Sequence, residues 1–315
     1  MLTKSEFISL ISSQKVLILD GGLATECARR GYDLNSKLWS AKLLASNPDV
    51  LKAVHKAYYE AGADIAITAS YQASVVGLKE GLGIDDSAAV RLVEESVSLA
   101  RQAATEVPSK KKLLVAGSIG PYGAYLANGA EYTGAYSLSE SEFRRFHSGR
   151  MDALIRAGVH VLALETMPSL AEIKVVLELV RETRAIAWVG CSLCEAGHLA
   201  DGTPLKEVYE VVERYDDCVV AFGVNCVPVQ MVNLTLTQLN TPGIGTLPWV
   251  VYPNSGEIWD PEKKEWKGPR PVGGRLANQA RKWYTSGARL IGGCCRTGPQ
   301  DIEDIVKALE HAKIL

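Results

Sequence analysis

Eight short runs of nearly continuous apolar residues recur along the chain, and they restrict its possible folds more than any other feature. Each run is apolar at successive positions rather than at alternate ones, which is typical of strands covered on both faces, as in parallel sheets. Segments with helical periodicity separate the runs. The runs are VLILDGG (16–22), DIAITASY (64–71), LLVAGSIG (113–120), VLALETMP (161–168), IAWVGCSLC (186–194), VVAFGVNC (219–226), WVVYPNSG (249–256) and LIGGCC (290–295).

The helical segments between the runs carry start and stop signals. Ser139 with Glu142, and Ser169 with Glu172, have the spacing of a capping box, in which a serine and a glutamate satisfy the free backbone N–H groups of a helix start. One joint recurs before the second, fourth and eighth runs, and its glycine is predicted to end the preceding helix in a left-handed conformation. These glycines are Gly62, Gly158 and Gly287.

Eight strand–helix units predict an α/β fold, a (β/α)₈ TIM barrel in a single domain over residues 1–315. The competing fold is a doubly wound open sheet, and the number of units and the chain length favour the barrel. Right-handed crossovers then place the carboxyl ends of all strands on one face, where active sites of barrels lie. Two long connections rich in glycine and aromatic residues, 121–138 and 253–273, are predicted to cover that face as lids.

Charge and cysteine content exclude several classes of function. The chain has 34 basic and 36 acidic residues, and its longest basic run is the three lysines at 110–112, so nucleic acid and anionic membranes are not expected partners. No apolar stretch is long enough to span a membrane, and the first 15 residues read as an amphipathic helix rather than a signal peptide. Seven cysteines, an odd number, indicate thiols used for chemistry in a reduced compartment. We therefore expect a soluble, cytoplasmic protein; no motif marks an oligomer interface.

Three cysteines follow predicted strands and are candidate metal ligands. Cys226 ends the sixth run, and Cys294 and Cys295 end the eighth, which indicates a three-thiolate Zn²⁺ site with a fourth position open for substrate. Because neighbouring strand residues face opposite ways, both members of the pair can bind one metal only if the backbone twists, and Gly292-Gly293 could allow this. The alternative is three buried, inert cysteines. The C-x-x-C formed by Cys191 and Cys194 is interpreted as packing.

The expected charge of such a centre limits its chemistry. Zinc on three thiolates is a poorer Lewis acid than zinc on neutral histidines, so the site is poorly suited to making hydroxide from water. It can instead bind a further thiol as its thiolate, which a free thiol with a pKa of about 8.5 supplies only sparsely at neutral pH. The indicated reaction is alkyl transfer to a substrate thiol.

Polar residues at the same predicted face are candidate substrate ligands. Asp20 and Glu165 end the first and fourth runs, and each could pair with a substrate ammonium group or cap the following helix. Four further residues could hold a substrate carboxylate or satisfy loop backbone groups. These are Thr68, Ser70, Asn225 and Asn254.

The segments LDGG, ITASYQAS, SIGPYGAY, ALETMP, GVNC, VYPNSGE and RLIGGCCRT together resemble the homocysteine S-methyltransferase family, closest to its single-domain sulfonium-dependent branch. The resemblance covers nearly the whole chain. It implies a (β/α)₈ barrel with one zinc on Cys226, Cys294 and Cys295, homocysteine bound through its thiol to that metal, and its ammonium group at Asp20 and Glu165. Thr68 and Ser70 are carried over as further substrate contacts. It also implies methyl transfer from S-methylmethionine or S-adenosylmethionine to homocysteine, forming methionine.

Two other functions use the same residues. A glycosidase would employ Asp20 and Glu165 as its paired carboxylates but leaves the three cysteines at the barrel rim unexplained. A metal-buffering or redox-sensing protein would use the thiols without methyl transfer. The five histidines show no metal-binding spacing.

Overall fold

The computed structural model describes residues 1–239, 247–256, 258–260, 265–267 and 275–315. Eight strands pair in parallel in the order β1-β12-β9-β8-β5-β4-β3-β2. A parallel bridge between Leu19 and Ile65 joins the two ends of this order and closes the sheet into a barrel. The strands are β1 (Leu17–Ile18), β2 (Ile65–Ile67), β3 (Leu114–Ile119), β4 (Val161–Met167), β5 (Ala187–Cys191), β8 (Val219–Asn225), β9 (Trp249–Tyr252) and β12 (Ala288–Ile291).

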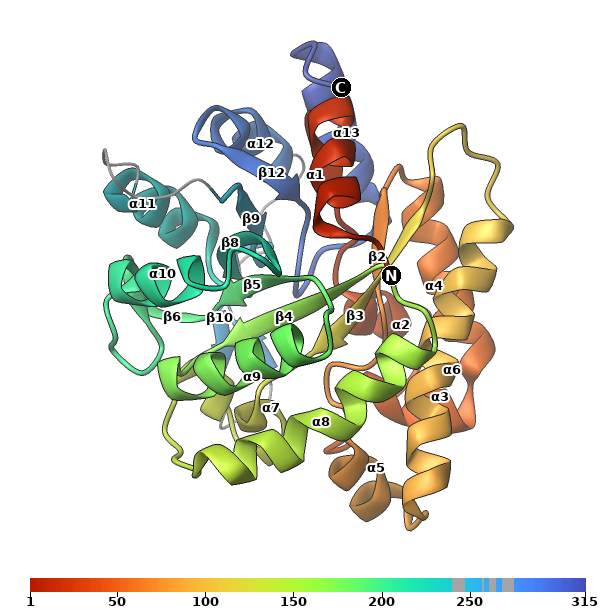
Figure 1. Cartoon of the computed structure of the whole chain (residues 1–315). Helices are drawn as coiled ribbons and strands as arrows, with labels where there is room; N and C mark the ends of the chain where they lie inside the picture. The colour runs from red at the N-terminus through yellow and green to blue at the C-terminus, as the bar shows by residue number, and fades with distance from the viewer. Residues whose placement is uncertain (240–246, 257, 261–264, 268–274) are drawn as a thin grey trace.

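Each barrel strand overlaps one of the eight apolar runs, and only β12 extends beyond its run, by two residues at its start, so the predicted barrel is confirmed and the open sheet is excluded. Helices follow every strand and surround the barrel (Figure 1). They are α2 (Leu23–Arg29), α3 (Leu43–Ser46), α4 (Pro48–Glu60), α5 (Val75–Leu82), α6 (Asp86–Thr105), α7 (Tyr122–Leu126), α8 (Glu140–Arg156), α9 (Leu170–Glu182), α10 (Leu205–Glu213), α11 (Val229–Leu239), α12 (Arg275–Thr285) and α13 (Pro299–His311), with short 3₁₀ turns η1 (Trp39–Lys42) and η2 (Ala130–Tyr132).

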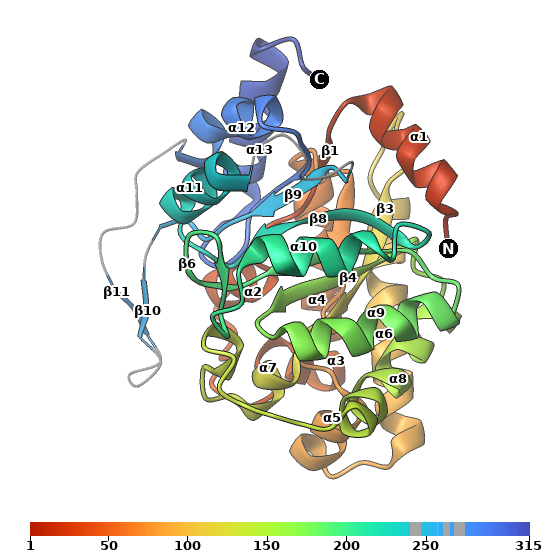
Figure 2. The same cartoon turned by 60° about the vertical axis from the view of Figure 1, so that its left-hand side comes forward.

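The apolar runs are continuous because both faces of the strands are buried. Outward-facing residues such as Val189 and Val251 pack against the helices, and inward-facing residues such as Trp188 and Val250 fill the barrel. The amino-terminal helix α1 (Lys4–Gln14) adds Phe7 to the inner cluster. Figure 2 shows α1 at one end of the barrel, opposite the end that carries the hairpins described below. The barrel is therefore filled from the amino-terminal side, which leaves the carboxyl ends of the strands for a site.

Of the two predicted capping boxes, one forms in the structure and the other does not. Ser139 and Glu142 form the predicted capping box at α8. The capping box predicted at Ser169 is wrong, because its side chain makes no cap hydrogen bond and the backbone N–H of Leu170 donates instead to Asp201 Oδ2 at 2.9 Å. The three joint glycines do adopt the left-handed conformation, with φ of 99° at Gly62, 85° at Gly158 and 98° at Gly287.

Two small antiparallel hairpins extend from the carboxyl-terminal side of the barrel. One is β6 (Leu193–Glu195) with β7 (His198–Leu199), after β5; the other is β10 (Ile258–Asp260) with β11 (Glu265–Lys267), after β9. The second hairpin belongs to the connection 253–273, most of which lies outside the described residues, so its proposed lid role stays a prediction. Among the described residues, no helix combines the length and apolar character needed to cross a membrane.

Candidate active site

A cavity opens at the carboxyl ends of the barrel strands, and residues in the last part of β1, β2, β4, β8 and β12 or directly after these strands form much of its wall. Seven of the nine residues singled out in the sequence line it. These are Asp20, Thr68, Glu165, Asn225, Cys226, Cys294 and Cys295. Ser70 and Asn254 do not line the cavity, although both are buried close behind its wall.

The three cysteines come together as a sulfur cluster. Their Sγ atoms all lie within 4.8 Å of one another, and Cys226 Sγ is 3.7 Å from Cys295 Sγ. Two sulfurs bound to one tetrahedral zinc at about 2.3 Å are separated by about 3.8 Å, so this pair already has the spacing of metal ligands. Cys226 and Cys294 are joined as a disulfide, and they must be reduced before all three sulfurs can bind a metal. The donor set and its geometry fit a soft divalent metal ion.

The two adjacent cysteines reach one point because they no longer belong to a strand. β12 ends at Ile291, and a turn follows at Cys295 and Arg296, so the alternation of side chains along a strand does not apply. The preceding glycines do not adopt a left-handed conformation; they allow close packing. A Cβ on Gly292 would lie 2.6 Å from Leu19 Cβ, and one on Gly293 would lie 2.4 Å from Thr297 Oγ1. These glycines therefore contribute by allowing close packing, and not by the backbone twist that we expected from the sequence.

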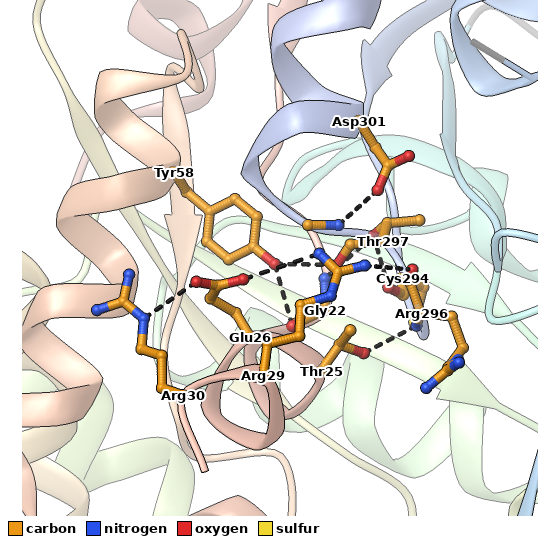
Figure 3. A network of polar contacts seen from close by, with 11 residues as sticks. Gly22, Thr25, Glu26, Arg29, Arg30, Tyr58, Cys294, Arg296, Thr297 and Asp301 are labelled. Carbon is orange, nitrogen blue, oxygen red and sulfur yellow. Dashed lines mark hydrogen bonds and ion pairs between the residues drawn. The ribbon is translucent and has the colours of Figure 1, made fainter. Parts of the chain in front are cut away.

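A polar network fixes the loop that carries Cys294 (Figure 3). Thr297 is central to it: its hydroxyl donates to Cys294 O at 2.6 Å and accepts from Gly22 N at 3.1 Å. The hydroxyl of Tyr58, in α4, lies 3.0 Å from Gly22 O and 3.1 Å from Thr297 O. These bonds join the loop after β1 to the loop after β12, and so they position Cys294 beside the loop that begins with Asp20.

Asn254 connects the other two cysteines. Its Nδ2 donates to Cys226 O at 3.0 Å, and its Oδ1 accepts from Cys295 N at 3.1 Å. Cys226 has φ of 52°, a left-handed conformation that is uncommon outside glycine and asparagine. Because both side-chain groups of Asn254 bind the backbone of the cluster, this residue holds the cysteines in place; its contact with a substrate carboxylate stays a prediction.

Asp20 is buried and keeps one carboxylate oxygen free. Oδ2 accepts a 2.8 Å hydrogen bond from Ile67 N, whereas Oδ1 has no partner. Burial, and secondarily the nearby charge of Glu165, raise the pKa of Asp20 well above its ordinary value. A buried acceptor without a donor is costly, so this oxygen is suited to a cationic N–H donor from a ligand.

Glu165 lies inside β4 and lines the same cavity as Asp20. Burial raises its pKa to about 7, although hydrogen bonds from Ser118 and Tyr252 lower it. The Tyr252 hydroxyl in turn accepts from Trp188 Nε1 at 3.1 Å, which connects the carboxylate to the filled barrel interior. A cation bound beside Glu165 would restore its ionised form, since an opposite charge favours the carboxylate.

The remaining predicted substrate ligands are engaged in the scaffold. Thr68 Oγ1 lies 2.7 Å from Ser70 Oγ and accepts from Ser118 N at 3.0 Å, while the Ser70 hydroxyl donates to Ser118 O at 2.8 Å. Asn225 forms a reciprocal pair with Thr166: it accepts from the Thr166 N–H at 2.7 Å and donates to the Thr166 hydroxyl at 2.8 Å. Thr166 has φ of 56°, so Asn225 stabilises a strained residue next to Glu165.

The connection 121–138 contributes residues to the cavity that the sequence reasoning did not single out. Glu131 and Tyr132, in η2, line the cavity, and the Tyr132 hydroxyl hydrogen bonds with Cys295. Tyr71 and Trp39 line it as well. The glycine- and aromatic-rich composition predicted that this connection is a lid, but nothing in its pattern distinguishes Glu131 from the other polar residues of the loop.

A parallel eight-stranded barrel with a thiol cluster and two buried carboxylates at its carboxyl-terminal rim defines a TIM-barrel enzyme with a candidate metal centre. Comparison with known proteins makes the assignment more specific. Residues 17–309 match the family model described as homocysteine S-methyltransferase. The chain belongs to this family.

Individual relatives agree with the family match. A homocysteine S-methyltransferase of Escherichia coli (strain K12) is 46% identical over 93% of this chain and 95% of its own length. Homocysteine S-methyltransferase YbgG of Bacillus subtilis (strain 168) is 44% identical over 94% of this chain and 95% of its own. The crystal structure of the homocysteine methyltransferase MmuM from E. coli in its metallated form superposes with a TM-score of 0.84 at 44% identity, covering 94% of this chain and 97% of that one.

Proposed function

We propose that this enzyme transfers a methyl group from a sulfonium donor, S-methylmethionine or S-adenosylmethionine, to the thiol of L-homocysteine, forming methionine. The observation that carries the proposal is the sulfur cluster of Cys226, Cys294 and Cys295 in one cavity with the buried carboxylates of Asp20 and Glu165. Family membership supports the acceptor.

The metal is proposed to be one Zn²⁺ per chain, held by the three cysteines in their reduced form. When bound, it would supply a fourth ligand position that lowers the pKa of the substrate thiol. The protein alone does not favour thiolates here: burial, together with the charges of Glu131 and Glu165, raises the pKa of Cys295 to about 12. A site of three thiolates also requires a reducing compartment, which is why we propose a cytoplasmic enzyme.

The acceptor amino acid is proposed to bind through its ammonium group. Asp20 Oδ1 offers an unused acceptor, and Glu165 offers a second carboxylate whose charge a bound ammonium would stabilise. Together they would orient homocysteine with its side chain toward the sulfur cluster. Residues 1–315 would then act as one homocysteine-binding barrel domain.

The transfer needs positioning and a dry cavity more than further acid–base chemistry. The bond between the methyl carbon and the donor sulfur breaks as the bond to the homocysteine sulfur forms, and the thiol proton is released to solvent. Because an anion and a cation neutralise each other in the transition state, exclusion of water by Tyr71 and the lid residue Tyr132 favours the reaction. Holding the two sulfurs in line contributes on the order of 7–11 kcal/mol relative to free encounter.

The test is zinc content measured alongside methionine formation from homocysteine, with S-methylmethionine and S-adenosylmethionine as separate donors. One zinc per chain with turnover on either donor supports the proposal and ranks the donors. Zinc without turnover would point to a different thiol or donor. A reduced protein that takes up no zinc would contradict the proposed centre and return the cysteines to a packing role.

A further inference from the structure

The cavity contains one carboxylate more than the acceptor needs. Asp20 and Glu165 extend from the barrel, and Glu131 extends from the lid connection. Two carboxylate oxygens in this cavity are buried without a hydrogen-bond partner, Asp20 Oδ1 and Glu131 Oε2. A buried, unsatisfied acceptor destabilises the folded chain, so a native site that keeps two of them is prepared for two hydrogen-bond donors.

Glu131 forms a separate acidic position. Burial raises the pKa of both Asp20 and Glu131, to about 7 for Glu131, and the charge of Glu165 adds to the rise at Asp20. Glu131 lies in η2 of the lid connection beside Tyr132, and its charge raises the pKa of Tyr132 and, together with that of Glu165, the pKa of Tyr71. The cavity thus has a barrel-side pair and a lid-side single carboxylate.

The sulfur cluster lies within reach of both positions. Glu131, Glu165 and the three cysteines line the same cavity. Tyr132, the neighbour of Glu131, contacts Cys295 directly through its hydroxyl. A ligand bound at Glu131 would therefore approach the sulfur cluster from the lid side, while a ligand at Asp20 and Glu165 would approach it from the barrel side.

The lid holds Glu131 in place independently of its carboxylate. The Glu131 carbonyl accepts from Ser192 Oγ at 2.6 Å, and the neighbouring Ala130 N–H donates to Asn128 Oδ1 at 3.1 Å. A Cβ on Gly123 would lie 2.6 Å from Glu131 N, so α7 packs tightly against η2 at this point. These contacts fix the backbone and leave the carboxylate for a ligand.

We propose that Glu131 Oε2 binds the ammonium group of an amino-acid sulfonium donor, and that Glu131 thereby recognises the donor while Asp20 and Glu165 recognise the acceptor. The assignment rests on the proposed methyl transfer, in which both substrates are amino acids and each brings one ammonium group. The sulfonium centre itself has no N–H and cannot satisfy the free oxygen, so the amino group is the matching part of the donor.

The test is calorimetric binding of S-methylmethionine to the zinc-loaded protein, saturated with L-2-aminobutyrate. This analogue has the amino and carboxylate groups of homocysteine but no thiol, so it occupies the acceptor position and prevents turnover. Glu131→Gln and Glu131→Ala are compared with Glu140→Gln, which changes an exposed glutamate at the start of α8. We expect Kd for S-methylmethionine to rise about 10- to 100-fold in both Glu131 variants and to stay within twofold in the control.

A second ligand tests the amino group itself. Dimethylsulfoniopropionate has the sulfonium and the carboxylate but no amino group, and we expect wild type and the Glu131 variants to bind it equally. Unchanged S-methylmethionine binding in the variants, or an equal loss for both ligands, would overturn the assignment. So would a rise in Kd for L-2-aminobutyrate instead of the donor.

Turnover is measured separately, so the two proposals can fail independently. Wild type that forms methionine while Glu131→Ala binds the donor normally would leave the proposed function standing and remove the role of Glu131. Donor binding that depends on Glu131, without methionine formation, would leave the role of Glu131 standing and contradict the proposed function. Wild type that binds neither S-methylmethionine nor S-adenosylmethionine would contradict both.

Discussion

At the scale of single residues, this cavity is built at the expense of stability. Asp20 and Glu165 are carboxylates in a buried wall, Thr166 and Cys226 have left-handed backbone conformations, and Asn225 and Asn254 use their side chains to hold those two residues. The buried carboxylates and the left-handed backbone conformations are costly for a folded chain without a ligand, and the two asparagines offset part of that cost. The loss of folding stability is concentrated at or next to the residues that are proposed to bind the substrate or the metal.

Glu165→Gln should stabilise the free protein at high pH while weakening acceptor binding. Burial raises the pKa of Glu165 from about 4.5 to about 7, so its proton is bound more tightly in the folded state. Its contribution to stability is therefore fully present below pH 4.5 and is lost as pH rises through 7, a loss of about 3 kcal/mol at ~1.4 kcal/mol per pKa unit. Urea unfolding at pH 4 and pH 8 should show the variant gaining stability over wild type only at pH 8.

Kinetics provide the functional half of the Glu165 prediction. KM for homocysteine should rise at least tenfold in Glu165→Gln, and the wild-type fall of kcat/KM below pH 7 should flatten, because the group that titrates is gone. Glu60→Gln, an exposed change at the end of α4, is the matched control. An unchanged KM for homocysteine would remove Glu165 from the acceptor site.

Asn254→Ala should weaken metal binding without touching a metal ligand. The variant loses the bonds to Cys226 O and Cys295 N, so the two backbones that carry these ligands are no longer held together. Loss of such supporting groups typically costs about 10- to 100-fold in metal affinity. Competition with a zinc chelator measures the change, with exposed Asn35→Ala as the control. Equal zinc affinity in the two variants would mean that Asn254 only satisfies the loop.

At the scale of elements, the lid connection depends on one buried carboxylate. Glu172 in α9 accepts from Tyr122 N at 2.6 Å and from the hydroxyl of Tyr136, and it lies 2.7 Å from His147 Nε2. Tyr122 and Tyr136 stand on either side of η2. Glu172 therefore ties both ends of the segment that carries Glu131 and Tyr132, which explains why its predicted partner Ser169 is left without it.

Tyr136→Phe should loosen the lid and leave the barrel intact. The variant leaves one Glu172 oxygen without its donor in a buried environment, which costs about 1–3 kcal/mol. Tyr125→Phe is the matched control, because the hydroxyl of Tyr125 donates to Glu80 at a more exposed position and should cost under about 0.5 kcal/mol. Limited proteolysis should cut Tyr136→Phe within 121–138 faster than the control. Identical cleavage rates would show that the segment is held by packing alone.

At the scale of the whole molecule, the sequence predicted what depends on local pattern and missed what depends on tertiary contacts. Two-sided burial produces apolar runs, so the eight strands and their shared rim could be found, and with them the convergence of the three cysteines. The capping pair at Ser169 failed because Asp201, distant in sequence, takes the cap. The scaffold role of Asn254 and the presence of Glu131 in the cavity depend on contacts across loops, which leave no periodic signal.

The metal centre should also stabilise the molecule as a whole. Cys226 follows β8, Cys294 and Cys295 follow β12, and Asn254 follows β9, which lies between them in the sheet. A metal on the three sulfurs would therefore tie β8 to β12 across β9, whose Asn254 already binds both cysteine backbones. A ligand at a thousand times its Kd contributes about 4 kcal/mol to the folded state, so chelation under reducing conditions should lower Tm by several degrees.

Cys226→Ala separates this effect from general damage. The variant should keep the circular dichroism spectrum of the barrel, lose zinc and methyl transfer, and show a Tm that no longer responds to zinc or chelator. Cys218→Ala, at the opposite end of the same strand, removes a thiol that is not part of the cluster and should keep the full response. Without reductant, the Cys226–Cys294 disulfide should block zinc uptake in the wild type, and added reductant should restore it. A Cys226→Ala protein that loses zinc yet keeps full activity would show that the metal stabilises the barrel without taking part in methyl transfer.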